Sequence, residues 1–239
     1  MSRLTQLSSE RTLGDPRADS PLGCRSRCDE WRTWLADGRD FGQLIVNGRD
    51  GQAPTIVPTH FVVDDVVAGS TDLLVHLARP NPVWADIDAN PHVVVSVIDD
   101  YGFIPGTWRA AAGVRTEDGV PTSYYAAVQL QCSAEIVDDP AAKAALLIQQ
   151  LAHFQPAGDH ADPRDLAAPY ARLLSGIRGL RLHVTDVRAK FKYDDHQPTE
   201  LRSDVTARLT DRGNGRDTGV AAQQQRRLDR IGPWRAGTN

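Results

Sequence analysis

The sequence predicts an α+β protein built around an antiparallel split β-barrel with flanking helices. Some six segments rich in β-branched residues follow one another from Phe41 onward, and Gly, Pro, Asn and Asp residues separate them. Two Asp-Pro pairs, at Asp139 and Asp162, begin segments whose apolar residues have helical spacing. With 41% apolar residues, the chain of 239 residues can also bury a substantial core.

The predicted strands run through the middle of the chain. The first closes on the turn signal Asn47-Gly48, and Pro58 in the second predicts an edge strand or a bulge. A turn is expected at 117–120. The strands are expected at 41–48, 55–63, 73–78, 92–98, 122–137 and 180–193, the fifth as one long strand or two joined at a bulge, with a further extended piece at 101–108.

Helices are expected at four places. The segment 29–37 carries two tryptophans on one face, and 81–88 has a proline near its start. Asp139 provides the N-cap of a third helix and Asp162 that of a fourth, in each case followed by proline in the first turn. Gly179 ends the fourth helix.

Polar segments flank the barrel, which is assigned to residues 29–199. Residues 1–28 lack any periodicity and predict a flexible N-terminal arm. Residues 200–239 hold eight arginines and five acidic residues, a local net charge of +3 in a chain whose formal net charge is −4. We expect a solvated, weakly ordered basic tail containing one frayed helix, and a nucleic-acid-binding tail is the alternative.

Composition excludes several classes of protein. No apolar run approaches the ~20 residues of a membrane span, and the N-terminus lacks the apolar region of a secretory signal. Cys24, Cys28 and Cys132 cannot form a disulfide framework, and the first two have no second pair to complete a zinc site. We therefore expect a cytoplasmic protein with reduced thiols.

No common catalytic motif is present, so the candidate residues are polar side chains within predicted strands. His60 and His76 each interrupt an apolar strand. A neutral imidazole can bind iron or another metal, and a half-buried, hydrogen-bonded histidine is the alternative. Arg79, close to Asn81 at a helix start, is a candidate clamp for phosphate or carboxylate, with a surface salt bridge as the alternative.

A second group of candidates flanks the predicted turn at 117–120. Trp108-Arg109 and Tyr124-Tyr125 can meet across this hairpin. Adjacent tyrosines point to opposite faces of a strand, so at most one of them faces a given pocket. Packing in the core or in an interface is the alternative for both.

The last strand carries two of the three lysines of the chain. Lys190 and Lys192 leave this strand on one face, with Phe191 opposite. The pair suits an anionic partner such as a phosphate or a propionate, and a solvated strand face is the alternative.

The order of these pieces resembles the PaiB-type FMN-binding split-barrel family, described as negative transcriptional regulators and related to pyridoxamine-phosphate-oxidase-like barrels. The resemblance covers about residues 41–198 and implies a homodimer with the cofactor near the interface. It rests on Thr59-His60-Phe61, on the segment from His76 through Arg79 and Asn81 to Trp84, on Val120-Pro121-Thr122 with Tyr125 to Val128, and on Lys190-Phe191-Lys192.

Three departures from the family pattern concern the cofactor, and in one of them Pro105-Gly106-Thr107-Trp108 replaces the family's Ser-Pro-Ser-Trp segment. Ser123-Tyr124 stands where the family has a Trp-Asn pair, and Asp194-Asp195 follow the lysines, where they are expected to repel the phosphate of FMN. The segments 103–109 and 122–128 resemble instead a haem-binding branch, the piperazate synthases. These close N5-hydroxy-L-ornithine to L-piperazic acid with loss of water, so the resemblance implies haem b, with FMN as the alternative cofactor.

The resemblance to this branch also implies roles for the candidate residues. His60 is the first choice and His76 the second for the axial ligand of the haem iron. Tyr124 or Tyr125 would deliver a proton to the departing oxygen. The remaining cofactor-binding or substrate-binding candidates are Arg79, Asn81, Trp108, Arg109, Lys190 and Lys192. An FMN-binding regulator and a barrel without a cofactor are the competing interpretations.

Overall fold

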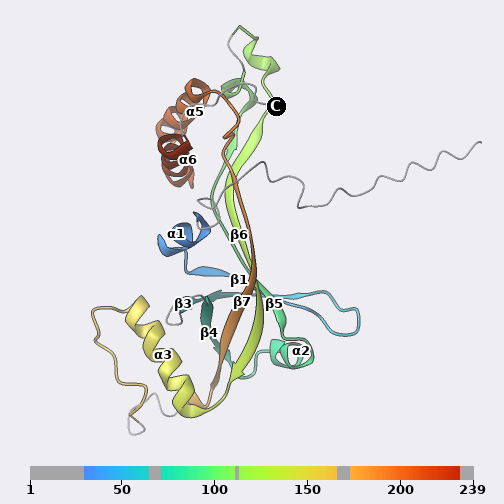
Figure 1. Cartoon of the computed structure of the whole chain (residues 1–239), viewed down its shortest axis with the longest axis vertical. Coiled ribbons are helices and arrows are strands. Elements are labelled where there is room, and N and C mark those ends of the chain that lie inside the picture. The colour runs from blue at the N-terminus through green and yellow to red at the C-terminus, as the bar shows by residue number, and fades with distance from the viewer. Residues whose placement is uncertain (1–29, 65–70, 111–112, 166–172, 232–239) are drawn as a thin grey trace, which may run out of the picture.

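The computed structural model describes residues 30–64, 71–110, 113–165 and 173–231, which contain one seven-stranded antiparallel sheet (Figure 1). The strand order across the sheet is β2-β1-β5-β6-β7-β4-β3. The strands are β1 Phe41–Val46, β2 Thr55–His60, β3 Val62–Asp64, β4 Asp72–Ala78, β5 His92–Ile104, β6 Thr122–Val137 and β7 Ile177–Lys192.

The sheet curls into a half-barrel, which confirms the predicted split-barrel class. Its two edge strands, β2 and β3, follow one another along the chain with only Phe61 between them. The backbone N–H of Phe61 donates to the carbonyl oxygen of Asp40 at 2.8 Å. Pro58 lies in an edge strand, as predicted, where its missing N–H costs little.

The three central strands extend beyond the barrel. β5 combines two segments that were expected separately and has a bulge between Asp99 and Gly102. β6 and β7 contain 16 residues each, and their register shifts between Gln131 and Cys132. Of the two expectations for β6, the single long strand is therefore confirmed, because the extra residue at this register shift, Thr185, lies in β7.

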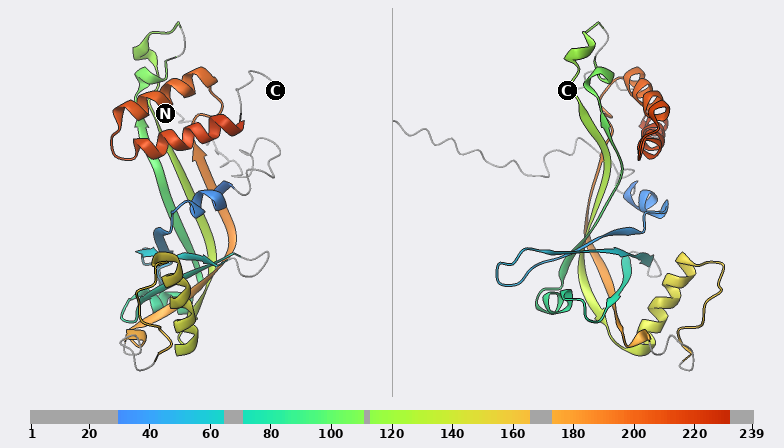
Figure 2. Two further views of the ribbon diagram at one scale, coloured as in Figure 1. Left: turned by 90° about the vertical axis from the view of Figure 1, so that its left-hand side faces the viewer. Right: turned by 180° about the vertical axis from the view of Figure 1, so that it is seen from behind.

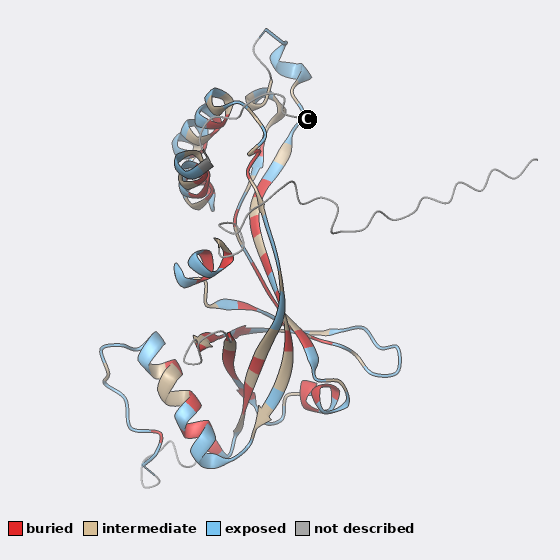
Figure 3. Cartoon of the chain, in the orientation of Figure 1, coloured by how far each residue is buried: buried red, intermediate tan, exposed pale blue. Residues whose placement is uncertain are grey.

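The core lies on the inner face of the sheet (Figure 3). Because side chains alternate along a strand, Val93, Val95 and Val97 of β5 are buried while Ile98 is 60% exposed. Cys132 is a buried free thiol on the neighbouring strand, whereas Cys24 and Cys28 lie outside the described residues.

The helices α1, α2 and α3 begin near the predicted positions. The carboxylate of Asp139 accepts a hydrogen bond from the N–H of Ala142 at 2.8 Å and caps α3, as predicted. The arm at 1–28 and residues 166–172 of the helix expected after Asp162 lie outside the described residues. The expectation that this helix ends at Gly179 was wrong, because Gly179 lies in β7 and pairs with His76 and Val137. None of the helices in the described part of the chain is long and apolar enough to cross a membrane. The helices are α1 Glu30–Ala36, α2 Val83–Ala89, α3 Pro140–Phe154, α5 Thr199–Arg212 and α6 Asp217–Ile231, with single 3-10 turns at Gly106–Trp108 and Thr116–Asp118.

The C-terminal segment is not the weakly ordered tail that its polar composition predicts. α5 and α6 form a helical hairpin beside the upper part of the long strands (Figure 2). Val205, Leu209 and Val220 are fully buried and belong to the core cluster. A narrow apolar stripe is sufficient to dock each helix, because helices in proteins are stabilised mainly by packing.

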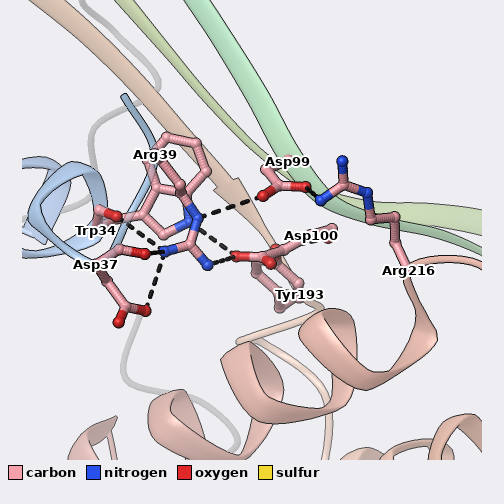
Figure 4. Close-up of polar contacts among 7 residues, drawn as sticks. All are labelled: Trp34, Asp37, Arg39, Asp99, Asp100, Tyr193 and Arg216. Carbon is pink, nitrogen blue, oxygen red and sulfur yellow. Dashed lines mark hydrogen bonds and ion pairs between the residues drawn. The ribbon is translucent and has the colours of Figure 1, made fainter. Parts of the chain in front are cut away.

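A polar hub at the β5 bulge joins the helices to the sheet (Figure 4). Asp100 has a φ of 48° and is 4% exposed. Its Oδ2 accepts hydrogen bonds from Trp34 Nε1 and Arg39 Nη2, both at 2.8 Å. The Tyr193 hydroxyl donates to the Asp100 carbonyl oxygen at 2.9 Å. Arg216 pairs with Asp99, the residue before Asp100, at 2.6 Å. The bulge therefore connects α1, the end of β7 and the start of α6.

Candidate functional site

Several of the predicted site residues lie on the outward-facing side of the sheet. Directly opposed residues on neighbouring strands share a face, and the register aligns Ile98, Ala127 and Lys190 across β5, β6 and β7. The helices α1, α5 and α6 all lie on the other side of these strands (Figures 1 and 2). We use the name outer face for the positions Phe41, His60, Ile98, Tyr125, Lys190 and Lys192.

Two lysines and a tyrosine gather at one end of the outer face. Lys192 Nζ donates to Thr122 Oγ1 at 2.8 Å and lies 5.9 Å from the centroid of the Tyr125 ring. Lys190 is exposed. Phe191 points to the inner face, where its ring centroid lies 5.8 Å from that of Trp34. The predicted separation of the lysines from Phe191 is therefore confirmed.

At the other end of the outer face, His60 presents an exposed imidazole, with 62% of its side chain accessible. The ring centroids of Phe41 and Phe154 lie 4.7 and 5.0 Å from that of His60. Its Nδ1 lies 3.9 Å from Oδ1 of Asp40, whose Oδ2 is 2.8 Å from Nε2 of His153. His60 thus has aromatic neighbours and a carboxylate on its Nδ1 side.

His76 is exposed on β4 and contacts the same helix as His60. Its Nδ1 lies 2.6 Å from Oε1 of Gln150 in α3. Gln150 and Phe154, the α3 contact of His60, are four residues apart and therefore lie on one side of the helix.

The pairing of β3 with β4 also places His60 and His76 at the same level of the sheet. Val62 of β3 pairs with Leu74 of β4, and the two histidines lie two residues beyond this pair in the same direction. The two predicted iron ligands therefore both contact α3, at residues one helical turn apart, and we call His60, His76, Gln150 and Phe154 the histidine site. No group of three or more His, Cys, Asp or Glu side chains suited to a metal ion occurs among the described residues. Each histidine of the site could therefore bind iron only as a single protein ligand, as in haem proteins, and not as part of a larger ligand cluster.

Tyr124 lies on the inner face, behind the sheet from Tyr125. It is fully buried, and its hydroxyl donates to Oδ2 of Asp194 at 3.1 Å. Arg109 Nε donates to the same oxygen at 2.8 Å. Burial, together with the negative charge of Asp194, raises the pKa of Tyr124 well above its usual value. Tyr124 and Arg109 meet as predicted, but away from the outer face.

A cavity of about 270 Å³ lies beside the histidine site, between α1, β3 and the end of α3. Asp40 and His153 line it together with Trp31, Phe61 and Val63. Sequence reasoning missed Asp40 and Gln150. The only signal for Gln150 was a polar residue at helical spacing from Phe154.

Residues 25–186 match the model of a protein family described as "Putative FMN-binding domain". The chain belongs to this family. A search of curated proteins gave no match. Among solved structures, the chain is similar to the flavocytochrome Anf3 from Azotobacter vinelandii, with 16% identity, a TM-score of 0.49, and coverage of 67% of this chain and 65% of that one.

Two mycobacterial structures are similar over a comparable length. One is the FAD and heme binding protein from Mycobacterium smegmatis, with 20% identity, a TM-score of 0.46 and 71% of each chain covered. The other is the conserved hypothetical protein Rv2991 from Mycobacterium tuberculosis, with 15% identity, a TM-score of 0.46, and coverage of 71% of this chain and 86% of that one.

Asp194 and Asp195, which follow β7 and were expected to repel the phosphate of FMN, both have arginine partners. Asp194 is 5% exposed and is bound by Arg109 and Tyr124. Asp195 pairs with Arg227 and lies 3.4 Å from Nη2 of Arg202. Arginines therefore pair with both carboxylates, which weakens the expected repulsion of an FMN phosphate; that repulsion stays a prediction.

Three further candidates have structural partners within the chain. Arg79 pairs with Asp138 at 3.0 Å. Asn81 Oδ1 accepts a hydrogen bond from the first backbone N–H of α2 at 3.2 Å. The guanidinium of Arg212 lies 4.8 Å from the Trp108 ring centroid, so Trp108 helps to fasten α5. Cofactor-binding roles for Arg79, Asn81 and Trp108 stay predictions.

Proposed function

We propose that this member of the FMN-binding family binds haem b and catalyses N–N bond formation, closing N5-hydroxy-L-ornithine to L-piperazic acid with loss of water. The observation that carries the proposal is the histidine site, where two exposed imidazoles from different strands contact α3 at residues one helical turn apart. The likeness of segments 103–109 and 122–128 to the piperazate synthases supplies the reaction.

The residues around His60 fit a haem. Phe41 and Phe154 offer aromatic surface to an apolar macrocycle, and they are 53% and 41% exposed. A ligating histidine commonly has a carboxylate or carbonyl partner on its second nitrogen, and Asp40 occupies that side of His60. His60 would therefore hold the haem iron, with His76 as the second choice. When bound, haem iron would supply a Lewis acid for the N–OH group.

Three other residues of the outer face suit charge pairing and proton donation. Lys190 and Lys192 are cations that a propionate or the substrate carboxylate can pair with. Tyr125 is the better proton donor of the two tyrosines, because it lies on the outer face beside Lys192. Tyr124 is buried and is a weaker acid because its pKa is raised.

We further propose a homodimer in which the second copy covers part of the outer face. Ile98 and Phe103 are each 60% exposed and Tyr101 is 55% exposed, all on or beside the same long strand. Exposed apolar side chains gathered on one surface are typical of an interaction site. Light scattering after gel filtration should give the mass of two chains.

An FMN-binding protein of the parent family is the second candidate function. It is favoured by the neutralised aspartates after β7, which leave Lys190 and Lys192 available to a phosphate. The absorption spectrum of the purified protein separates the candidates. One strong Soret band supports haem, two weaker visible and near-ultraviolet bands support FMN, and a colourless protein contradicts both.

A further inference from the structure

Gln150 is a buried polar residue whose two amide atoms are both committed. It is 5% exposed and projects from α3 toward β4. Its Nε2 donates to the carbonyl oxygen of Leu74 at 3.0 Å, and its Oε1 lies 2.6 Å from Nδ1 of His76. An amide held at both its nitrogen and its oxygen in this way has one orientation.

The direction of these contacts determines where the proton of His76 resides. A carbonyl oxygen only accepts, so the amide nitrogen of Gln150 must face Leu74 and the amide oxygen must face His76. That oxygen is also an acceptor, so Nδ1 of His76 must carry a hydrogen. In the neutral ring, Nε2 is then the nitrogen with the lone pair, on a side chain that is exposed.

We propose that Gln150 is a positioning residue that holds neutral His76 as the Nδ1–H tautomer, so that Nε2 of His76 accepts a hydrogen bond from an N–H or O–H donor of a ligand at the histidine site. An ammonium or a hydroxylamine group is the chemical class that this acceptor recognises. The identity of the ligand rests on the proposed function, whereas the tautomer does not. His60 remains the residue assigned to the cofactor.

The tautomer can be measured directly in the cofactor-free protein. Long-range ¹H–¹⁵N correlation spectra of ¹⁵N-histidine-labelled protein, recorded at mildly alkaline pH, distinguish protonated from unprotonated ring nitrogens. We expect wild-type His76 to show a protonated Nδ1 and an unprotonated Nε2. Gln150→Met removes the acceptor with little change in volume and should move His76 toward the Nε2–H form that free histidine favours.

Two more variants make the test specific. Gln150→Glu restores an acceptor next to His76 and should restore the Nδ1–H tautomer. Gln149→Met changes the neighbouring glutamine of the same helix, which lies on a different side, and should leave the His76 signals unchanged. A wild-type His76 that is protonated on Nε2, or a Gln150→Met protein with unchanged tautomer, overturns the proposal.

Ligand recognition has its own readout. Titration of the cofactor-free protein with N5-hydroxy-L-ornithine should shift the Nε2 resonance of wild-type His76, and should do so much less in Gln150→Met. A correct tautomer in a protein that never takes up haem would overturn the proposed function and not this inference. A haem-containing protein with the opposite tautomer would overturn this inference and not the proposed function.

Discussion

The hub at the β5 bulge allows one stability prediction to be worked out from the structure. Asp100→Ala removes the carboxylate that accepts from Trp34 Nε1 and Arg39 Nη2. Trp34 is fully buried, so its N–H would be left unsatisfied at a cost of about 1–3 kcal/mol. Loss of the charge-assisted bond to Arg39 adds about 1.5–3 kcal/mol. We expect a total loss of about 2.5–6 kcal/mol in the free energy of unfolding.

The same arginine provides a matched control. Asp37 also pairs with Arg39, at 3.0 Å, but its side chain is 69% exposed. Exposed ion pairs contribute little, so Asp37→Ala should cost less than about 1 kcal/mol. Asp100→Asn keeps one acceptor oxygen and a residue that tolerates positive φ, and should lie between the two alanine variants.

Urea unfolding followed by tryptophan fluorescence measures these differences. For a chain of this size each kcal/mol corresponds to about 2–4 °C in Tm, so Asp100→Ala should also melt about 5–24 °C below wild type. Equal stability of the Asp100→Ala and Asp37→Ala proteins would refute the reasoning that burial makes the difference.

The outer face and the C-terminal hairpin give three further predictions. Tyr125→Phe should lower turnover about 100-fold with unchanged thermal unfolding, whereas Tyr124→Phe should mainly lower stability; the reverse pattern would contradict the assignment of faces. The double variant Lys190→Gln, Lys192→Gln should lose its cofactor on gel filtration, and full retention of the cofactor would count against the lysines. Hydrogen bonds from Arg212 hold the pKa of Asp217 below its usual range. The Asp217 carboxylate therefore stabilises the folded protein at pH values above about 3.9, the pKa of aspartate in the unfolded chain. This stabilisation is lost as the pH falls through the lower pKa of Asp217 in the native protein. Asp217→Asn should lower the urea midpoint at neutral pH and leave it nearly unchanged in strong acid, and equal midpoints at neutral pH would contradict this.

Local patterns predicted the strands and α3 well because those patterns have local causes. Alternation of apolar residues sets which side of β5 is buried, and the Asp139-Pro140 pair fixes the start of α3. The facing of Lys190 and Lys192 follows from the same two-residue period.

The sequence could not predict features that depend on contacts between distant segments. Alternation places Tyr124 and Tyr125 on opposite faces, but only the packing of α5 and α6 decides which face is covered. Asp194 is neutralised by Arg109, 85 residues away. Gln150 and His76 are 74 residues apart, and nothing local to either residue indicates the other.

Conversion of N5-hydroxy-L-ornithine by the haem-loaded protein tests the central claim most directly. Mass spectrometry should show loss of one water from the substrate and a product that co-elutes with L-piperazic acid. His60→Ala should lose both the Soret band of the wild-type protein and the product. A haem-containing wild-type protein that leaves the substrate unchanged, or a His60→Ala protein with normal haem and normal turnover, would contradict the account.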